Sequence, residues 1–210
     1  MKDLFSEKMT GSPNRPFRIL TVCTGNICRS PFLELLLNIE FSDEPILVES
    51  AGTAALVGHA TDETMQSFAP DCAIGKLSNH RARQLTQGLL QEADLVLALD
   101  RNHRRIIAEM YPRAIRRAFT LREFSRLCNL VDMDVVSAGS HDSKFDALSS
   151  AVNKVSMMRG TGPILEDPAA DDVLDPFRRD QNDYVRCVQQ LTPAANKTAW
   201  FLKRAMSGDR

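Results

Sequence analysis

Short, mostly apolar runs alternate with amphipathic segments along much of the chain. The apolar runs have the length of strands and cover residues 18–23, 46–49, 94–99 and 118–121. Continuous apolar runs of this kind are typical of strands buried on both faces of a parallel sheet. The segments predicted to be helical follow or separate these runs, at 31–41, 62–68, 86–92, 102–110, 122–127, 145–157 and 180–206.

This alternation predicts a doubly wound α/β fold, in which helices cover both faces of one sheet. We expect a single domain with a short central parallel sheet of about four strands, because 210 residues suffice for one full hydrophobic core. Residues 1–16 are polar and rich in turn formers, which predicts a flexible lead-in before a domain at 17–208. Residues 129–170 break the rhythm and indicate an insertion.

Two local features predict where helices begin and break. Ser30 precedes Pro31, which favours Ser30 as the N-cap of a helix with proline at its first position. Pro193 lies inside the last helical segment, so we expect a kink or two helices, with Thr192 capping the second.

Charge and composition exclude several classes of protein. The 26 Lys and Arg residues nearly balance the 27 Asp and Glu residues, and a net charge of −1 argues against nucleic-acid binding. No apolar run approaches the roughly 18 residues that span a bilayer, and the first residues lack the apolar core of a signal peptide. We therefore expect a soluble, cytoplasmic protein with neither a membrane nor a nucleic-acid partner.

The five cysteines are odd in number and scattered, so they do not form a disulfide framework, and a reducing compartment fits them. No Cys and His residues stand at zinc-site spacing, and no metal is expected. Cys72, Cys128 and Cys187 fit the core as packing residues.

The loop after the first predicted strand carries the chemistry. Cys23 ends the strand, and five residues separate it from Arg29, which directly precedes Ser30 at the start of the helix. Backbone N–H groups at a helix N-terminus stabilise a thiolate and form an anion-binding nest. Gly25 and Asn26 tolerate the positive φ angles of such a nest, and a guanidinium can hold two phosphate oxygens at once. The arrangement indicates phosphoryl transfer through a covalent thiophosphate. The alternative is a buried structural cysteine beside an unrelated arginine.

The segment Val22–Pro31 resembles the phosphate loop of the low-molecular-weight protein tyrosine phosphatases. The resemblance continues in the family's order through Ser50–Thr53, His80–Gln84, Ala93–Asp100 and Asp175–Phe177. It covers most of residues 17–127 and 171–191 but not 129–170. The resemblance implies a flavodoxin-like topology with the phosphate loop after the first strand, and protein-tyrosine-phosphatase activity without a cofactor.

The resemblance also implies a role for each residue of these motifs. Cys23 is expected to be the nucleophile and Arg29 the phosphate clamp, while the Ser30 hydroxyl donates to the thiolate. Backbone groups of the loop would donate to the phosphate, from Thr24, Gly25, Asn26, Ile27 and Cys28. Ser50 and His80 would form with Asn26 a hydrogen-bond network that holds the loop. The expected partners are a tyrosine-phosphorylated protein as substrate and inorganic phosphate as product, with the enzyme a monomer or weak dimer.

Two Asp-Pro pairs compete for the role of general acid. Asp175 is preferred over Asp167, because the aromatic Phe177 follows it and because it shortly precedes the last helix, as in the family. Ala169 follows the other pair. Asp175 would protonate the leaving phenol and later activate water.

An apolar side chain and an aromatic ring near the phosphate suggest the class of substrate. Ile27 on the rim of the cradle and Phe177 beside the acid would hold a phenyl ring, which favours phosphotyrosine. The sequence does not decide between phosphotyrosine and phosphoarginine beyond this hint. Arg178 and Arg179 follow Phe177 and favour acidic residues around the phosphotyrosine.

Several interpretations stay open. A thiol-dependent arsenate reductase has the same fold and a similar loop, but it needs a closely spaced pair of further cysteines, and Cys72 and Cys128 are 56 residues apart. A non-catalytic module that binds phosphate or sulfate is the second alternative. Cys28 is either the disulfide partner that protects an oxidised Cys23 or a packing residue. Asp100 lies near the expected site, or it caps the next helix.

Overall fold

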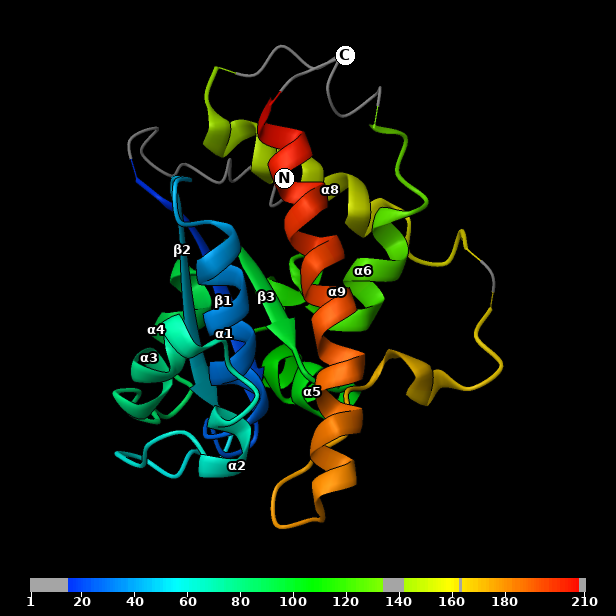
Figure 1. The fold of residues 1–210 in the computed structure, drawn as a ribbon. Coiled ribbons are helices and arrows are strands. Elements are labelled where there is room, and N and C mark those ends of the chain that lie inside the picture. The colour runs from blue at the N-terminus through cyan, green and yellow to red at the C-terminus, as the bar shows by residue number, and fades with distance from the viewer. Residues whose placement is uncertain (1–14, 134–141, 163, 208–210) are drawn as a thin grey trace.

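Four parallel strands form one sheet in the computed structural model, which describes residues 15–133, 142–162 and 164–207 (Figure 1). The strand order is β2–β1–β3–β4, with bounds β1 Phe17–Cys23, β2 Ile46–Gly52, β3 Leu95–Ala98 and β4 Ala118–Thr120. The predicted doubly wound α/β fold with a short parallel sheet is confirmed.

The pairing register brings the ends of the central strands to one edge. Cys23 at the end of β1 pairs with Gly52 at the end of β2, and Val22 pairs with Ala98 at the end of β3. In open parallel sheets, ligands bind beyond this carboxyl edge. The loop that follows Cys23 therefore begins where a site is expected.

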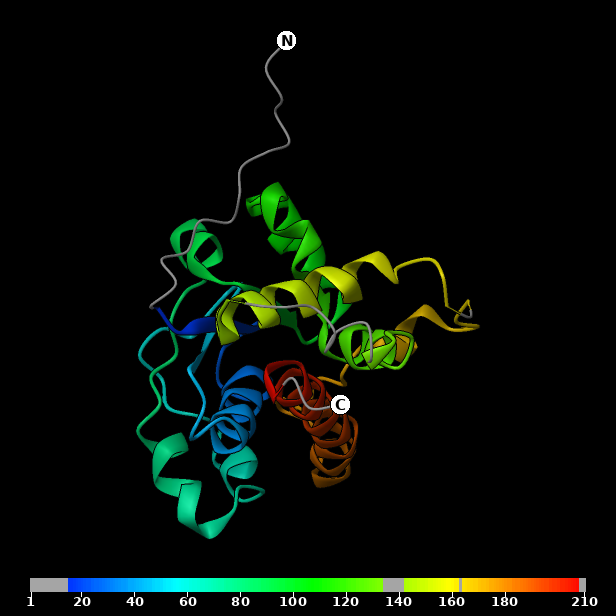
Figure 2. The same ribbon diagram turned by 90° about the horizontal axis from the view of Figure 1, so that it is seen from above.

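Alternation along the strands splits the core into two parts, one on each face of the sheet. The larger part contains Ile19, Leu95 and Leu97, and the smaller part contains Leu20 and Val96. Figure 2 shows α4 (Gln87–Glu92) and α5 (Arg101–Met110) on one side of the sheet, and α1 (Arg29–Glu40) and α9 (Gln181–Ser207) on the other. The remaining helices are α2 Glu63–Gln66, α3 Ile74–Ser78, α6 Leu121–Cys128 and α8 Lys144–Met157, with short 3₁₀ turns at Asp71–Ala73, Pro112–Arg116 and Pro168–Asp171.

The helix α8, inside the segment predicted as an insertion, packs across the amino ends of the strands. Its Phe145 ring lies 5.8 Å from the ring of Phe17, the first residue of β1. Arg15 stacks on the same Phe145 ring, with 4.8 Å to the centroid, and binds the Asp94 carboxylate with both terminal nitrogens (2.6 and 2.7 Å). Arg15 thus anchors the end of the predicted lead-in, whose residues 1–14 lie outside the described part of the chain.

The first helix begins two residues earlier than predicted. Arg29 is its first residue and Cys28 stands at the N-cap, without a side-chain capping bond. Ser30 is not the cap, because its hydroxyl lies 3.0 Å from the Cys23 sulfur and accepts from Asn26 Nδ2 instead. The Ser30 hydroxyl therefore takes part in the loop around Cys23 and does not cap the helix.

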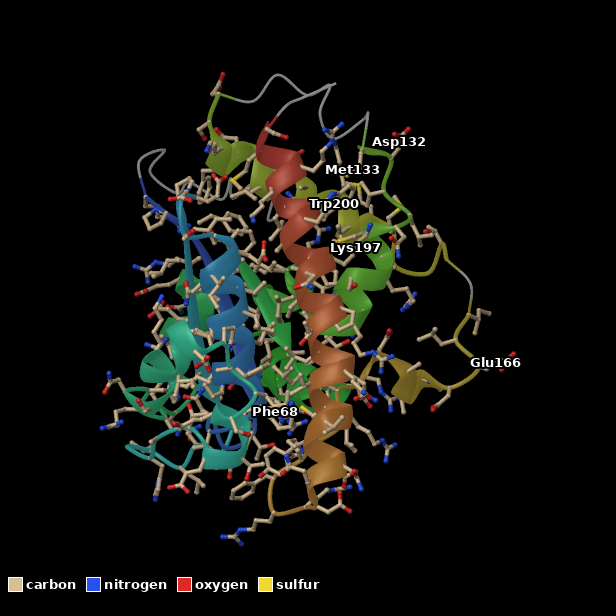
Figure 3. The ribbon with its side chains drawn as sticks, in the orientation of Figure 1. Phe68, Asp132, Met133, Glu166, Lys197 and Trp200 are labelled. Carbon is tan, nitrogen blue, oxygen red and sulfur yellow. The ribbon has the colours of Figure 1, made fainter. Side chains whose placement is uncertain are left out.

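The last helix is continuous from Gln181 to Ser207, with Pro193 inside it. The prediction that Thr192 caps a second helix is wrong. A proline removes one backbone hydrogen bond, but Leu191, Ala194 and Ala195 around it pack into the core, and that burial maintains the helix. On its outer face α9 carries the exposed Trp200 with Lys197 Nζ 4.2 Å from the ring centroid (Figure 3). None of the helices among the described residues is long and apolar enough to cross a membrane.

Candidate active site

The loop after β1 curls around the Cys23 sulfur. The thiol lies 3.0 Å from Ser30 Oγ and accepts the backbone N–H of Asn26 at 3.3 Å. Asn26 has a φ angle of +54°, which turns its N–H back toward the sulfur. Two polar groups thus face a sulfur that is otherwise buried (3% exposed), an arrangement that stabilises negative charge on it.

Every polar group of the Asn26 side chain and its carbonyl has a partner. Nδ2 donates to Ser30 Oγ (2.9 Å) and Ser50 Oγ (2.8 Å), and Oδ1 accepts the backbone N–H of Arg83 (2.9 Å). His80 Nε2 lies 2.9 Å from the Asn26 carbonyl oxygen, which can only accept, so Nε2 carries the proton. Burial lowers the pKa of His80 and keeps the ring neutral. These bonds hold the strained φ of Asn26, and they join the three residues that the sequence grouped as a network.

Arg29 crosses from the loop to two other segments. Its guanidinium is buried, and Nη2 lies 2.7 Å from Asp175 Oδ2. Nη1 donates to the Val173 carbonyl (3.1 Å) and to Asp100 Oδ2 (3.2 Å). The loop after β1, the end of β3 and the second Asp-Pro segment therefore meet at one guanidinium.

The two Asp-Pro pairs have different surroundings. The Asp175 carboxylate is 43% exposed, contacts Arg29 and accepts the backbone N–H of Phe177 at 3.3 Å. The Asp167 carboxylate instead accepts the backbone N–H of Ala169 at 2.8 Å and caps a short 3₁₀ turn. The structure brings Asp175, and not Asp167, to the loop that holds Cys23.

The two side chains expected around the substrate ring, Phe177 and Ile27, differ in how far they are buried. Phe177 is half-buried, and the Arg178 guanidinium lies 5.1 Å from its ring centroid. Ile27 is only 7% exposed and belongs to the main core, so most of it packs beneath the loop rather than standing on its rim. Thr24 is exposed, and Gly25 is half-exposed on the loop.

Cys28 is a free, buried thiol in the main core, and burial raises its pKa well above the ordinary value. Cys128 and Cys187 are buried in the same core, as expected of packing residues. The Cys72 side chain lies outside what the structure describes. Within the described ranges, no group of three or more His, Cys, Asp or Glu side chains could hold a metal ion.

The family model described as low molecular weight phosphotyrosine protein phosphatase matches residues 18–154, well over half of the chain. The chain belongs to this family. Its members are phosphatases that act on phosphorylated proteins. The matched residues include Cys23, Arg29 and Asp100, whereas Asp175 lies beyond them.

Individual relatives of this phosphatase carry two kinds of name. The low molecular weight protein-tyrosine-phosphatase Wzb of Escherichia coli K12 is 38% identical over 114 residues, which are 54% of this chain and 76% of that protein. The protein-arginine-phosphatase of Bacillus subtilis is 39% identical over 110 residues, 50% of this chain and 71% of that protein. Among solved structures, the YwlE arginine phosphatase of Geobacillus stearothermophilus aligns with a TM-score of 0.61 and 25% identity, over 90% of this chain and 94% of that one.

Beside the expected residues, the phosphatase site has a buried histidine that the sequence did not single out. His103 Nε2 lies 2.8 Å from Thr24 Oγ1 in the loop after β1. Its backbone N–H donates to Asp100 Oδ1 (2.8 Å), which confirms Asp100 as the N-cap of α5. Nδ1 lies 3.0 Å from the same oxygen but not in hydrogen-bonding geometry. The signal in the sequence that could have pointed to His103 is the spacing Asp-x-x-His at the start of a helix.

A second unpredicted group links the segment that contains Asp175 to the loop after β1. The Tyr184 hydroxyl, on α9, interacts with the Asp62 carboxylate and with the backbone of Arg178. Asp62 in turn donates its backbone N–H to the Ile27 carbonyl at 2.7 Å. Burial raises the pKa of Tyr184, so the hydroxyl stays protonated. Nothing in the sequence around Tyr184 distinguishes it from an ordinary buried aromatic.

Proposed function

We propose that the protein hydrolyses phosphotyrosine in proteins through a phosphocysteine intermediate on Cys23. The observation that supports this proposal most is the meeting of three groups at the carboxyl edge of the sheet. These are the Cys23 thiol, the Arg29 guanidinium and the Asp175 carboxylate. They have the chemistry of a nucleophile, an anion clamp and an acid.

In the first step, the Cys23 thiolate attacks phosphorus, and the bond from phosphorus to the phenolic oxygen breaks. Asp175 gives its proton to that oxygen, so the product leaves as a neutral phenol. The charge on the three equatorial oxygens is stabilised by loop N–H groups and by Arg29. The hydroxyl of Ser30 stabilises the thiolate before the attack.

In the second step, Asp175 takes a proton from water, whose oxygen attacks phosphorus and breaks the bond to sulfur. Inorganic phosphate leaves, the Cys23 thiolate is restored, and Asp175 is protonated again. Before substrate arrives, Asp175 occupies Arg29 Nη2 at 2.7 Å. Phosphate oxygens replace the carboxylate on the guanidinium, and Asp175, freed from this ion pair, takes up a proton from solvent and faces the leaving oxygen.

The substrate is proposed to be phosphotyrosine rather than phosphoarginine. A guanidinium substrate carries several N–H donors that need acceptors when it is desolvated. Ile27 presents only apolar atoms and packs beneath the loop, and Phe177 offers a ring beside the acid. An aromatic leaving group packs on the Phe177 ring without an unpaired polar group. The nucleophile requires a reduced thiol, which fits the predicted cytoplasmic location.

The test is hydrolysis of three peptides of one sequence that carry phosphotyrosine, phosphoserine or phosphoarginine. We expect kcat/KM to be highest for phosphotyrosine and to vanish for all three in the Cys23→Ser variant. A higher kcat/KM for phosphoarginine would overturn the assignment of the substrate but not the assignment of Cys23 as the nucleophile. Thioredoxin-dependent reduction of arsenate in place of hydrolysis would favour the reductase alternative.

A further inference from the structure

An arginine-lined pocket of about 410 Å³ lies between α5, α6 and the segment that follows α8. Four guanidinium groups line it, from Arg101 and Arg104 on α5, Arg126 on α6 and Arg159 just after α8. The neighbouring backbone contains Gly160, whose φ of +77° favours glycine. The residues after α8 are those that the sequence set apart as an insertion.

The arginines outnumber the carboxylates that line this pocket, which come from Glu123 and Asp171. Arg126 binds Asp171 through two nitrogens (2.8 and 3.2 Å). Arg159 donates to Glu123 at 3.0 Å, and its other two nitrogens donate to backbone carbonyls. Asp172 binds Arg101, so the four guanidinium groups have three carboxylates beside them. Figure 3 shows Glu166 at the outer edge of the segment, away from α5 and α6.

Arg104 is the arginine of this pocket that can donate further hydrogen bonds to a ligand. Its Nε donates to the Ala118 carbonyl at 3.0 Å and lies 3.6 Å from Glu123. Among the described residues, no group accepts a hydrogen bond from its two terminal nitrogens. Its side chain is 31% exposed, and the pocket is open to a ligand. A half-buried guanidinium with free donors, next to three guanidinium groups that are paired with carboxylates, is a site for an oxyanion.

The pocket adjoins the active site. Arg101 follows Asp100, the residue that contacts Arg29, and it binds Asp172 through its side chain (3.0 Å). Asp172 in turn precedes Val173, whose carbonyl accepts from Arg29. A peptide with its phosphotyrosine over Cys23 extends about 3.3–3.6 Å per residue, so side chains a few positions away reach the neighbouring surface.

The charge of the surrounding segment also favours an anionic ligand. Residues 101–126 contain eight arginines and two glutamates, whereas the whole chain has a net charge of −1. Such a local surplus raises the encounter rate of anionic partners.

We propose that this pocket binds a second oxyanion of the same phosphoprotein substrate, either another phosphoryl group or a carboxylate side chain near the phosphotyrosine. The inference rests on the proposed function, because it names a further feature of that substrate. It assigns to the pocket the recognition of substrates with two anionic groups and no part in the chemistry at Cys23.

The test compares two sets of peptides that differ only by a phosphoserine placed one to six positions from the phosphotyrosine. We expect a higher kcat/KM for at least one doubly phosphorylated peptide in the wild-type protein. The Arg104→Gln variant should lose about threefold to tenfold of that preference, with the singly phosphorylated peptide unaffected. Arg105→Gln is the matched control, since Arg105 lies on the same helix but pairs with Glu109 and does not line the pocket. Equal preference in wild type and Arg104→Gln would overturn the proposal.

A second measurement separates this proposal from the proposed function. In the Cys23→Ser variant, inorganic phosphate is titrated while the NMR signals of the arginine side chains are followed. A shift of the Arg104 signal that Arg105 does not share supports an oxyanion site, even if the wild type hydrolyses no phosphotyrosine peptide. A shift without any preference among the peptides would mean that the pocket takes free phosphate, and the proposal would be wrong. No shift at Arg104 would contradict an oxyanion site altogether.

Discussion

The titration of His103, beneath the nucleophile loop, should make the stability of the protein depend on pH. The ring is 1% exposed, and burial lowers its pKa to about 4. In an unfolded chain the ordinary pKa of histidine is about 6.5. Between these values the unfolded chain binds a proton that the folded protein does not. The free energy of unfolding therefore falls as the pH falls.

The size of this effect follows from the two pKa values. Protonation of the unfolded chain alone lowers the free energy of unfolding by roughly 3 kcal/mol by pH 4, of which roughly 2–3 kcal/mol is lost between pH 7 and pH 4.5. The charges around the ring act against each other: Arg29 disfavours the protonated ring, while Asp100, Asp172 and Asp175 favour it. Burial exceeds all of them. The loss is a large part of the 5–15 kcal/mol that stabilises a typical domain.

Urea unfolding at several pH values between 7 and 4.5 measures this loss. The His103→Gln variant lacks the titrating ring and should be less stable than the wild type at pH 7, because the contact with Thr24 changes. The difference in the free energy of unfolding between wild type and variant should decrease by roughly 2–3 kcal/mol at pH 4.5. His59→Gln, on an exposed loop, is the control for the loss of an imidazole. Curves for wild type and His103→Gln that stay parallel over this range would refute the reasoning.

Three other variants test single contacts of the site. Arg29→Lys should lower kcat/KM by about 10²–10³, because an ammonium does not reproduce the two-pronged grip on phosphate, and near wild-type kinetics would remove the clamp. Tyr184→Phe should lower kcat for phosphotyrosine about threefold to tenfold but not for an activated aryl phosphate, since it loosens the acid segment. The control is Tyr111→Phe, at a tyrosine that directly follows α5 and whose ring lies 5.9 Å from the Arg117 guanidinium. An equal loss of kcat on both substrates would argue against a positioning role for Tyr184. Cys28→Ser should prevent thiol reductants from restoring activity after mild peroxide treatment, and full recovery would make Cys28 a packing residue only.

The sequence predicted the sheet, most helices and the loop around Cys23, because these depend on local patterns. Buried strands appear as apolar runs, and a nucleophile at the end of a strand lies at the edge where ligands bind. The choice of Asp175 over Asp167 also depended on local signals, namely the aromatic residue and the distance to the last helix. In the structure it is Asp175 that contacts Arg29.

Tertiary contacts decided what the sequence missed. Serine is a favoured N-cap residue, but the Ser30 hydroxyl contacts the Cys23 sulfur and the Asn26 side chain instead. Pro193 usually ends a helix, but core packing on both sides of it keeps α9 continuous. Tyr184 interacts with Asp62, which is more than a hundred positions away in the sequence, so no local pattern predicts this interaction.

The most direct test of the account is to trap the phosphoryl group on the protein. Asp175→Ala should lose about 10²–10⁴ in kcat for phosphotyrosine but much less in the attack on an activated aryl phosphate, whose leaving group needs no proton. Because the same variant also lacks the base for water, the covalent intermediate should accumulate. Rapid acid quenching and mass spectrometry should then find one phosphoryl group on the peptide that contains Cys23, at its sulfur. Asp167→Ala, the matched control, should behave as the wild type. A phosphoryl group on another residue, or accumulation in Asp167→Ala instead, would contradict the account.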